Sequence, residues 1–440
     1  MEGEGTQLRR RLFHANDTDS KHALHTMRGM QDAPASTFSA NGRTYQRPSH
    51  PTVVVCVDGC EPDYLAQAVA AGCMPWLQRT LAEGMAWNAQ SALPSFTNPN
   101  NLSIVTGVPP SVHGICGNFF LDPASGDAIM MNDPQWLRCP TLLAAAAQAG
   151  LSVAVVTAKD KLRGLLGHGL QGICFSAECA DAATLATHGI DHVLKLVGLP
   201  KPSVYSAELS EFVFAAGVRL MQTRRPDLMY LSTTDYVQHK HAPGTAAANA
   251  FYAMLDGYMQ QLQDLGCVIA ITADHGMQPK AGMDGAPQVI YLSDWLQTFL
   301  QRSDARVILP ITDPYVVHHG ALGAFATVYL PNDVQAQPVC DALGRLQGVD
   351  MALTREHAAH ALDLPADRIG DVVVLADRMT ALGTTAAQHD LSALDAPLRS
   401  HGGRGEQTVP LIINRLVRQP APGRSMRNFD AFDLALNYAQ

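Results

Sequence analysis

The sequence predicts an α/β fold, with a mainly parallel sheet flanked by helices and a smaller α+β unit inserted into it. Two observations lead to this prediction. Up to about residue 275, short β-branched apolar runs alternate with segments of helical periodicity, a pattern typical of parallel sheets. Between about residues 285 and 395 the pattern changes to short, mixed strands and helices.

The first core strand is expected in His50–Gly59, where an apolar run stops at Asp58-Gly59, as in strands buried on both faces. Helices are then predicted at Tyr64–Ala71, Thr141–Ala149, Glu208–Thr223 and Ala246–Leu265. Further core strands are predicted at Ser152–Thr157, Asp227–Ser232, Cys267–Thr272 and Val409–Ile413. The inserted unit is expected to contain strands Arg306–Ile311, Ala326–Tyr329 and Asp371–Leu375, and helices Val339–Leu346 and Arg355–Leu362.

These elements divide the chain into three parts. Residues 1–48 are expected to form a polar, mobile tail, because they lack an apolar periodicity; they also lack the apolar core of a secretory signal. Residues 49–284 and 396–440 are expected to form the core domain, and residues 285–395 an α+β cap inserted into it.

Composition excludes several classes of protein. The 31 Lys and Arg against 40 Asp and Glu give a formal charge of −9, which argues against a protein that coats nucleic acid. No uninterrupted apolar run of about 18 residues predicts a membrane span. The nine scattered cysteines are interpreted as reduced, buried thiols of a cytoplasmic protein. A zinc pair at Cys56 and Cys60 is less favoured, since no second pair follows at the required spacing.

Polar residues follow each of the predicted parallel strands. Asp58, Lys159, Asp235 and Asp274 come at or just after the strand ends. Ligands of such sheets bind at the carboxyl edge, so this edge is the predicted site. A strand-terminal Asp taken alone is as often a turn former.

Two short motifs near these strand ends have metal-ligand spacing. Asp235 and His239 form D-x-x-x-H, which on a helix presents both side chains from one face. For this pair alone, a capping Asp and a surface His are the favoured explanation. Asp274-His275-Gly276 follows an apolar strand, and the glycine permits a turn that brings both side chains to one cation.

Together these motifs favour a di-metal site. The candidate ligands are the residue types that bind a borderline cation such as zinc: Asp58, Asp235, Asp274, His239, His275 and His401. His241, His318 and His319 are rivals that spacing does not exclude.

Thr97 is the candidate nucleophile. It precedes Asn98-Pro99 and an apolar helical stretch, so it is expected at a helix amino terminus, where N–H groups and the helix dipole stabilise an anion. Its hydroxyl needs a base or a metal to lower its pKa. The alternative is that Thr97 or Asn98 is only the N-cap.

The motifs V-D-G, P-S-x-T-x-P-N, D-x-x-x-H, A-D-H-G-M and a late H-G-G resemble those of the alkaline phosphatase superfamily, in its nucleotide pyrophosphatase/phosphodiesterase-like branch. The resemblance runs in motif order from about residue 50 to 430. Within that branch the sequence is most similar to the phosphonoacetate hydrolases, through three segments: Ser95–Asn101, Gly117–Phe120 and Thr157–Lys161.

The resemblance implies an alkaline-phosphatase-like core and two zinc ions. One zinc would be held by Asp58, Thr97, Asp274 and His275, and the other by Asp235, His239 and His401. It also implies that Asn118 binds a phosphoryl oxygen, that His239 contributes to substrate binding, and that Lys159 and Lys161 bind a substrate carboxylate. A homodimer is implied as well.

The spacing of Lys159 and Lys161 gives separate support for an anion site. Residues i and i+2 at a strand end point to the same side, although a solvated basic turn with Arg163 is the favoured explanation without the resemblance. The implied reaction is hydrolysis of the carbon–phosphorus bond of the small anion phosphonoacetate, through a phospho-threonine at Thr97. The alternatives are a phosphodiesterase or nucleotide pyrophosphatase of the same superfamily, and a zinc-binding protein without turnover.

Overall fold

The computed structural model describes residues 36–122, 124–312, 321–392, 394, 396–418 and 423–439. Residues Thr37–Gln440 form one compact unit. The first 35 residues of the predicted tail lie outside the described residues.

A seven-stranded sheet forms the centre of the fold, in the order β4-β19-β10-β3-β9-β7-β8. Strands β10, β3, β9, β7 and β8 are parallel, whereas β19 runs antiparallel to both β10 and β4. The mainly parallel sheet is therefore confirmed. The strands are β3 (Thr52–Cys56), β4 (Met85–Gln90), β7 (Val153–Thr157), β8 (Ile173–Ser176), β9 (Leu228–Ser232), β10 (Val268–Thr272) and β19 (Thr408–Ile413).

The predicted apolar runs form the middle of this sheet. Every residue of β3, β7, β9 and β10 is buried, which explains why these strands are continuously apolar and not alternating. Their bounds agree with the predicted ones to within a few residues. The edge strand β4 was not predicted, because only Ala89 of its six residues is buried and its sequence lacks an apolar run.

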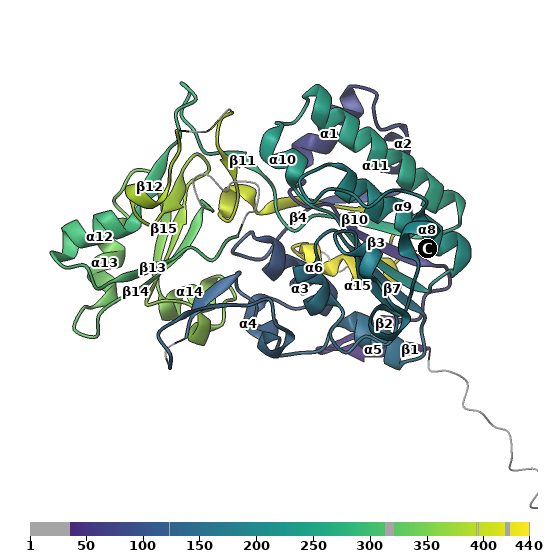
Figure 1. The fold of residues 1–440 in the computed structure, drawn as a ribbon, viewed down its shortest axis with the longest axis horizontal. Coiled ribbons are helices and arrows are strands. Elements are labelled where there is room, and N and C mark those ends of the chain that lie inside the picture. Colours follow the sequence, from purple (N-terminus) through teal and green to yellow (C-terminus); the bar gives the residue numbers. More distant parts are fainter. Residues whose placement is uncertain are drawn as a thin grey trace, which may run out of the picture. The chain divides into compact units, whose positions relative to one another are not determined.

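Two groups of helices cover the sheet (Figure 1). Helices α1, α2, α9 and α11 pack against one another, and α3, α5, α6 and α15 form the second group. Their bounds are α1 (Pro62–Ala70), α2 (Pro75–Glu83), α3 (Thr97–Thr106), α5 (Leu142–Gln148), α6 (Asp160–Leu166), α9 (Glu208–Thr223), α11 (Ala246–Asp264) and α15 (Ala431–Asn437). In the described part of the chain, none of the helices combines the length and apolar character needed to cross a bilayer.

The prediction of a mobile tail is wrong for residues 37–46. Strands β1 (Thr37–Ala40) and β2 (Arg43–Gln46) form an antiparallel hairpin that contacts α5 and α15. Phe38 and Tyr45 are buried and their rings stack at 5.3 Å. Only alternate residues of this hairpin are apolar, so it lacks the continuous run that marks the central strands.

A second sheet lies within the predicted insert, with the antiparallel order β13-β14-β16-β15 (green in Figure 1). It shares a small apolar core with α12 (Leu292–Leu300) and α13 (Ala336–Leu343). The other elements are β13 (Arg306–Ile308), β14 (Phe325–Tyr329), β15 (Val349–Thr354), α14 (Arg355–Ala361) and β16 (Val372–Ala376). The predicted strand at Arg306–Ile311 is shorter than expected, and α13 begins and ends three residues before the predicted helix.

Candidate active site

Several of the predicted site residues follow four neighbouring parallel strands. In the order β10-β3-β9-β7, the carboxyl ends are followed by Asp274-His275, Asp58, Asp235 and Lys159, respectively. Parallel strands end at one edge of the sheet, so the strand order brings these side chains together. All three aspartates and His275 are buried.

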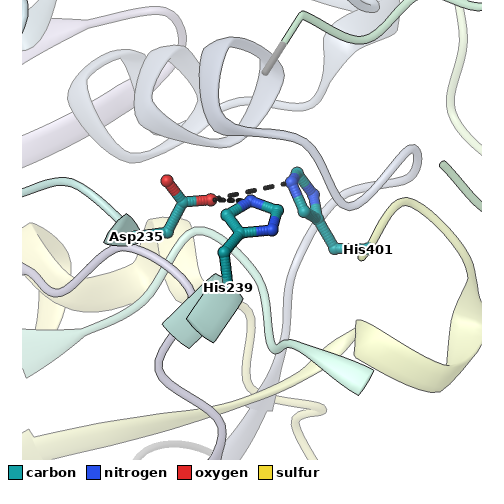
Figure 2. A group of neighbouring side chains, drawn as sticks. All are labelled: Asp235, His239 and His401. Carbon is teal, nitrogen blue, oxygen red and sulfur yellow. Dashed lines mark ion pairs between the residues drawn. The ribbon is translucent and has the colours of Figure 1, made fainter. Parts of the chain in front are cut away.

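Asp235, His239 and His401 form the first candidate metal cluster, with ligand atoms within 4.8 Å of one another. Asp235 precedes the short helix α10 (Tyr236–Lys240), so the predicted i, i+4 geometry is confirmed. Its Oδ2 lies 2.9 Å from Nε2 of His239 and 3.8 Å from Nε2 of His401. Figure 2 shows both rings turned toward this carboxylate.

His401 reaches this cluster through a short strand pair. Strand β18 (Arg399–Ser400) pairs antiparallel with β11 (Gln278–Pro279), which follows His275 by three residues. The rings of His275 and His401 consequently stack face to face, with centroids 3.6 Å apart. The late H-G-G motif is thus held against Asp274-His275.

A second candidate cluster consists of Asp58, Asp235 and His275. Nε2 of His275 lies 3.2 Å from Oδ1 of Asp58, 3.3 Å from Oγ1 of Thr97 and 4.0 Å from Oδ1 of Asp274. The ligand set expected here contained Asp274 in place of Asp235. Asp274 lies beside this cluster, with its Oδ1 4.0 Å from Nε2 of His275. Asp235 is the residue that belongs to both clusters.

The three histidines are oriented in the same way. Each Nδ1 contacts a backbone carbonyl oxygen, which can only accept a hydrogen bond, so Nδ1 carries the proton and Nε2 faces the carboxylates. This is the usual arrangement of metal-binding histidines. The pairs are His239 with Arg399 at 3.1 Å, His275 with Gly276 at 2.8 Å, and His401 with Ser95 at 2.8 Å.

The electrostatics of the clusters favour a cation. Burial, together with Asp235 and Asp274, raises the pKa of Asp58 well above its usual value. Although burial opposes it, the pKa of His275 is raised to about 10 by Asp274 and Asp58. Burial and the charge of His275 lower the pKa of His401 well below its usual value. A bound metal cation would compensate the buried carboxylates and displace the proton of His275.

The carboxylate of Asp58 supports a metal-binding role. Its Oδ1 is buried, and its neighbour among the described residues is Nε2 of His275 at 3.2 Å, which donates a hydrogen bond only when the ring carries a second proton. Buried polar atoms normally have a partner, so this oxygen is suited to a cation. Aspartate oxygens and histidine nitrogens are ligands of zinc, and the residues present therefore fit the metal that the sequence predicted.

Thr97 is the first residue of α3, after Phe96 as the N-cap. Neither Thr97 nor Asn98 is the N-cap, so the alternative of a mere capping role is wrong. Phe96 makes no side-chain hydrogen bond to the first turn. The N–H groups of that turn have no intrahelical partner and can stabilise an anion beside Thr97.

A cavity of about 590 Å³ brings Asp58 and Thr97 together with the predicted anion-binding residues. Its lining includes Asp58, Thr97, Asn98, Asn118, Lys159, Lys161, Glu178, Thr233, Ile311, Thr312 and Ala321. His239 is not among the lining residues, so its contribution to substrate binding stays a prediction.

The lysines reach this cavity for a different reason from the predicted one. They do not share a strand end: Lys159 is the extended N-cap of α6, and Lys161 lies in the first turn of that helix. The i, i+2 argument is therefore wrong, although both side chains line the cavity. The charge of Lys159 contributes to lowering the pKa of Asp235, against the effect of burial and after that of His239.

Asn118 also lines the cavity. Its Nδ2 donates a hydrogen bond of 2.5 Å to Oγ1 of Thr312, and its Oδ1 is buried without a partner among the described residues. Of the rival histidines, His241 belongs to neither cluster, and its carbonyl oxygen accepts a hydrogen bond from Tyr64. His318 and His319 lie outside the described residues.

Comparison with known proteins agrees with this geometry. The family model for type I phosphodiesterase / nucleotide pyrophosphatase matches residues 52–404. The chain belongs to this family. Family membership accounts for the mainly parallel sheet, and the alkaline-phosphatase-like core with its additional smaller sheets is confirmed.

The resemblance to phosphonoacetate hydrolase is also confirmed. The crystal structure of that enzyme from Sinorhizobium meliloti in complex with phosphonoacetate is 55% identical, with a TM-score of 0.89, over 92% of this chain and 99% of that chain. Phosphonoacetate hydrolase of Penicillium oxalicum is 56% identical over 41 residues, which is 57% of its length. An uncharacterized pyrophosphatase/phosphodiesterase of Schizosaccharomyces pombe matches over only 18% of its length. Murine ectonucleotide pyrophosphatase / phosphodiesterase 5 shares the fold at 17% identity, with a TM-score of 0.58 over 88% of this chain and 94% of that chain.

Sequence reasoning missed the role of Asn101 in this family member. It is fully buried in α3, and its Nδ2 donates to Oδ2 of Asp274 at 3.0 Å. The available signal was its position four residues after Thr97, but the same helix also contains Asn98, Asn100 and Ser103, so Asn101 did not stand out. Position alone could not identify its partner, which follows a strand far away in sequence.

Proposed function

We propose that this chain hydrolyses the carbon–phosphorus bond of phosphonoacetate to acetate and phosphate, with two zinc ions and Thr97 as the nucleophile. The observation that carries the proposal is the single cavity whose lining includes Thr97, Asp58, Asn118 and both lysines. It provides a nucleophile, metal ligands and cationic groups in one space. The identity to a phosphonoacetate hydrolase supports the same substrate.

Substrate binding would use the two ends of the cavity. Lys159 and Lys161 would bind the carboxylate, because a charge-assisted hydrogen bond to an ammonium group is strong. Asn118 and His239 would contact phosphonate oxygens near Thr97. The carboxylate and the phosphonate of one small molecule would then fix its orientation.

The metal ligands would be divided as the sequence resemblance implies. Asp58, Thr97, Asp274 and His275 would hold one ion, and Asp235, His239 and His401 the other. Bound zinc supplies Lewis acidity that favours the alkoxide form of Thr97 and stabilises charge developing on the phosphonate. The carbonyl groups that accept from the three Nδ1 atoms would keep each Nε2 directed at the ions.

The reaction would proceed in two steps. The Thr97 oxygen bonds to phosphorus while the phosphorus–carbon bond breaks, and the electron pair moves onto the methylene carbon. This charge delocalises into the carboxylate as acetate enolate, which Lys159 and Lys161 stabilise, and a proton then gives acetate. Water attacks the phospho-threonine, releases phosphate and restores the Thr97 hydroxyl.

Phosphate release from phosphonoacetate by zinc-loaded protein tests the proposal. A nitrophenyl phosphodiester and a chelator-treated sample serve as controls. Chelator-sensitive release from phosphonoacetate alone is expected. Activity on the diester alone would favour the phosphodiesterase or nucleotide pyrophosphatase alternative. Zinc binding without turnover of either substrate would favour a non-catalytic zinc protein.

We also propose that residues 285–395 form a cap that restricts the site to small substrates. Ile311, Thr312 and Ala321 of this segment line the cavity. Replacing the segment by a short linker in a variant that still binds zinc is expected to admit bulky diesters. Unchanged selectivity would contradict this role. The cytoplasmic location and the homodimer stay predictions, which fractionation and sedimentation would check.

A further inference from the structure

The amide of Asn101 occupies a buried position between the nucleophile, a candidate metal ligand and the central sheet. It lies one helical turn after Thr97 in α3. Its Nδ2 donates to the carbonyl oxygen of Thr97 and to Oδ2 of Asp274, both at 3.0 Å. Its Oδ1 accepts from the hydroxyl of Tyr230 at 2.7 Å and from that of Ser232 at 2.8 Å.

These partners use the whole hydrogen-bonding capacity of an asparagine. The amide has two N–H donors and two acceptor lone pairs, and each has one partner. The orientation of the amide follows from chemistry, because a carboxylate and a carbonyl can only accept, whereas the two hydroxyls can donate. No other side chain of this size offers both functions in this arrangement.

Both carboxylate oxygens of Asp274 accept hydrogen bonds. Its Oδ1 accepts from the backbone N–H groups of Gly59 and His275, at 3.3 and 3.0 Å. Nδ2 of Asn101 donates a hydrogen bond to Oδ2. Hydrogen bonds therefore fix both oxygens of this carboxylate. Its Oδ1 lies 4.0 Å from Nε2 of His275, a member of the second candidate cluster.

We propose that Asn101 is a positioning residue that sets Thr97 and Asp274 relative to each other, with Tyr230 and Ser232 of β9 holding its amide. This inference deepens the proposed function and depends on its metal site. Asn101 itself would touch neither substrate nor metal. Hydrogen-bonded neighbours of metal ligands typically change metal affinity or activity by about 10–100-fold when they are removed.

The test compares Asn101→Asp with Asn414→Asp. Asn414 also bonds to backbone and side-chain groups: it accepts from Ile269 and donates to Gln263 and Cys267. It lies beside the amino-terminal end of β10, at the opposite end from Asp274. Both substitutions add one carboxylate, so the pair controls for charge and for destabilisation.

Zinc titration of the metal-free proteins, thermal unfolding and steady-state kinetics are the readouts. For Asn101→Asp we expect about 10–100-fold weaker binding of at least one zinc ion and a fall in kcat with little change in KM. Asn414→Asp should change only the unfolding temperature. Wild-type zinc affinity and kcat in folded Asn101→Asp would overturn the inference, as would equal zinc losses in both variants.

Ser232→Ala is a milder second variant in case Asn101→Asp does not fold. It removes one hydroxyl that holds the amide and should weaken zinc binding in the same direction by a few-fold; unchanged affinity would overturn the inference. The zinc titration also separates the two proposals. Wild-type protein that binds zinc without cleaving phosphonoacetate would refute the proposed activity, while the zinc affinities would still decide the role of Asn101.

Discussion

At the scale of single residues, the site depends on how each polar group is oriented by its neighbours. The three histidines donate Nδ1–H to backbone carbonyls, which leaves Nε2 directed at Asp58 and Asp235. The buried Oδ1 of Asp58 lies 3.2 Å from Nε2 of His275. Burying these carboxylate charges costs free energy unless a cation compensates them. The lone pairs of the carboxylates and of Nε2 are therefore arranged to suit a metal ion.

Thr97→Ala should lower the rate of phosphate release from phosphonoacetate by about 10³-fold or more, as loss of a nucleophile does in other hydrolases. Thr97 is only half-buried, so the fold should persist and circular dichroism should be unchanged. Thr97→Ser is the control, since it keeps a hydroxyl and should retain measurable activity. Turnover by Thr97→Ala close to that of wild type would contradict nucleophilic catalysis.

Lys159→Ala should raise KM for phosphonoacetate by about 10–100-fold, because a hydrogen bond between charged groups contributes about 1.5–3 kcal/mol. A substrate without a carboxylate should be affected much less. Lys195→Ala provides a control with the same change in net charge on an exposed helical residue. Equal losses on both kinds of substrate would remove the carboxylate-binding role.

At the scale of elements, α3 connects the nucleophile to the rest of the core through buried polar contacts. Ser103 of this helix contacts Nε2 of His113 at 2.9 Å, and Nδ1 of His113 accepts from the N–H of Ile115 at 3.2 Å. His113 is fully buried in the short helix α4 (Pro110–His113). Its Nδ1 is occupied as an acceptor, so a second proton on the ring would break this contact.

This arrangement predicts acid sensitivity of the fold. Burial lowers the pKa of His113 to about 3, against about 6.5 in the unfolded chain. The unfolded state therefore binds the proton more readily, and the contribution is fully present above pH 6.5 and is lost as the pH falls toward 3. At pH 5 it amounts to about 2 kcal/mol less free energy of unfolding.

Urea unfolding of wild type and His113→Gln between pH 7.5 and 5 measures this contribution. Glutamine does not titrate, so the difference in stability between the two proteins should shrink as the pH falls. A difference that stays constant over this range would show that His113 does not couple folding to pH.

At the scale of the whole molecule, a buried ion pair joins the site loops to the second sheet. Nζ of Lys280 lies 2.8 Å from Oε1 of Glu406, and both side chains are fully buried. Lys280 also donates to the carbonyl of Arg378, just after β16. The backbone of Glu406 accepts from Gly276, and its Oε2 accepts from Gly403. One pair thus contacts the loops that carry His275 and His401.

Lys280→Met should lower the free energy of unfolding by about 3–5 kcal/mol, because it leaves Glu406 buried without its cation. The double variant Lys280→Met, Glu406→Gln removes both charges and should recover part of the loss. Chemical denaturation of the three proteins measures these differences. A single variant within about 1 kcal/mol of wild type would show that the pair is not needed for stability.

The central strands, their polar carboxyl ends and the ligand motifs could be predicted from the sequence, because these are local patterns of burial and spacing. The hairpin β1–β2 and the edge strand β4 were not predicted from the sequence, since only alternate residues or few of them are buried. Three features became visible only in the folded chain: the strand order β10-β3-β9-β7, the sharing of Asp235 between two clusters, and the stacking of His401 on His275. The folded chain also shows how Lys161 reaches the cavity and what Asn101 contacts. These features depend on strand pairing and packing between segments far apart in the chain, which local periodicity does not encode.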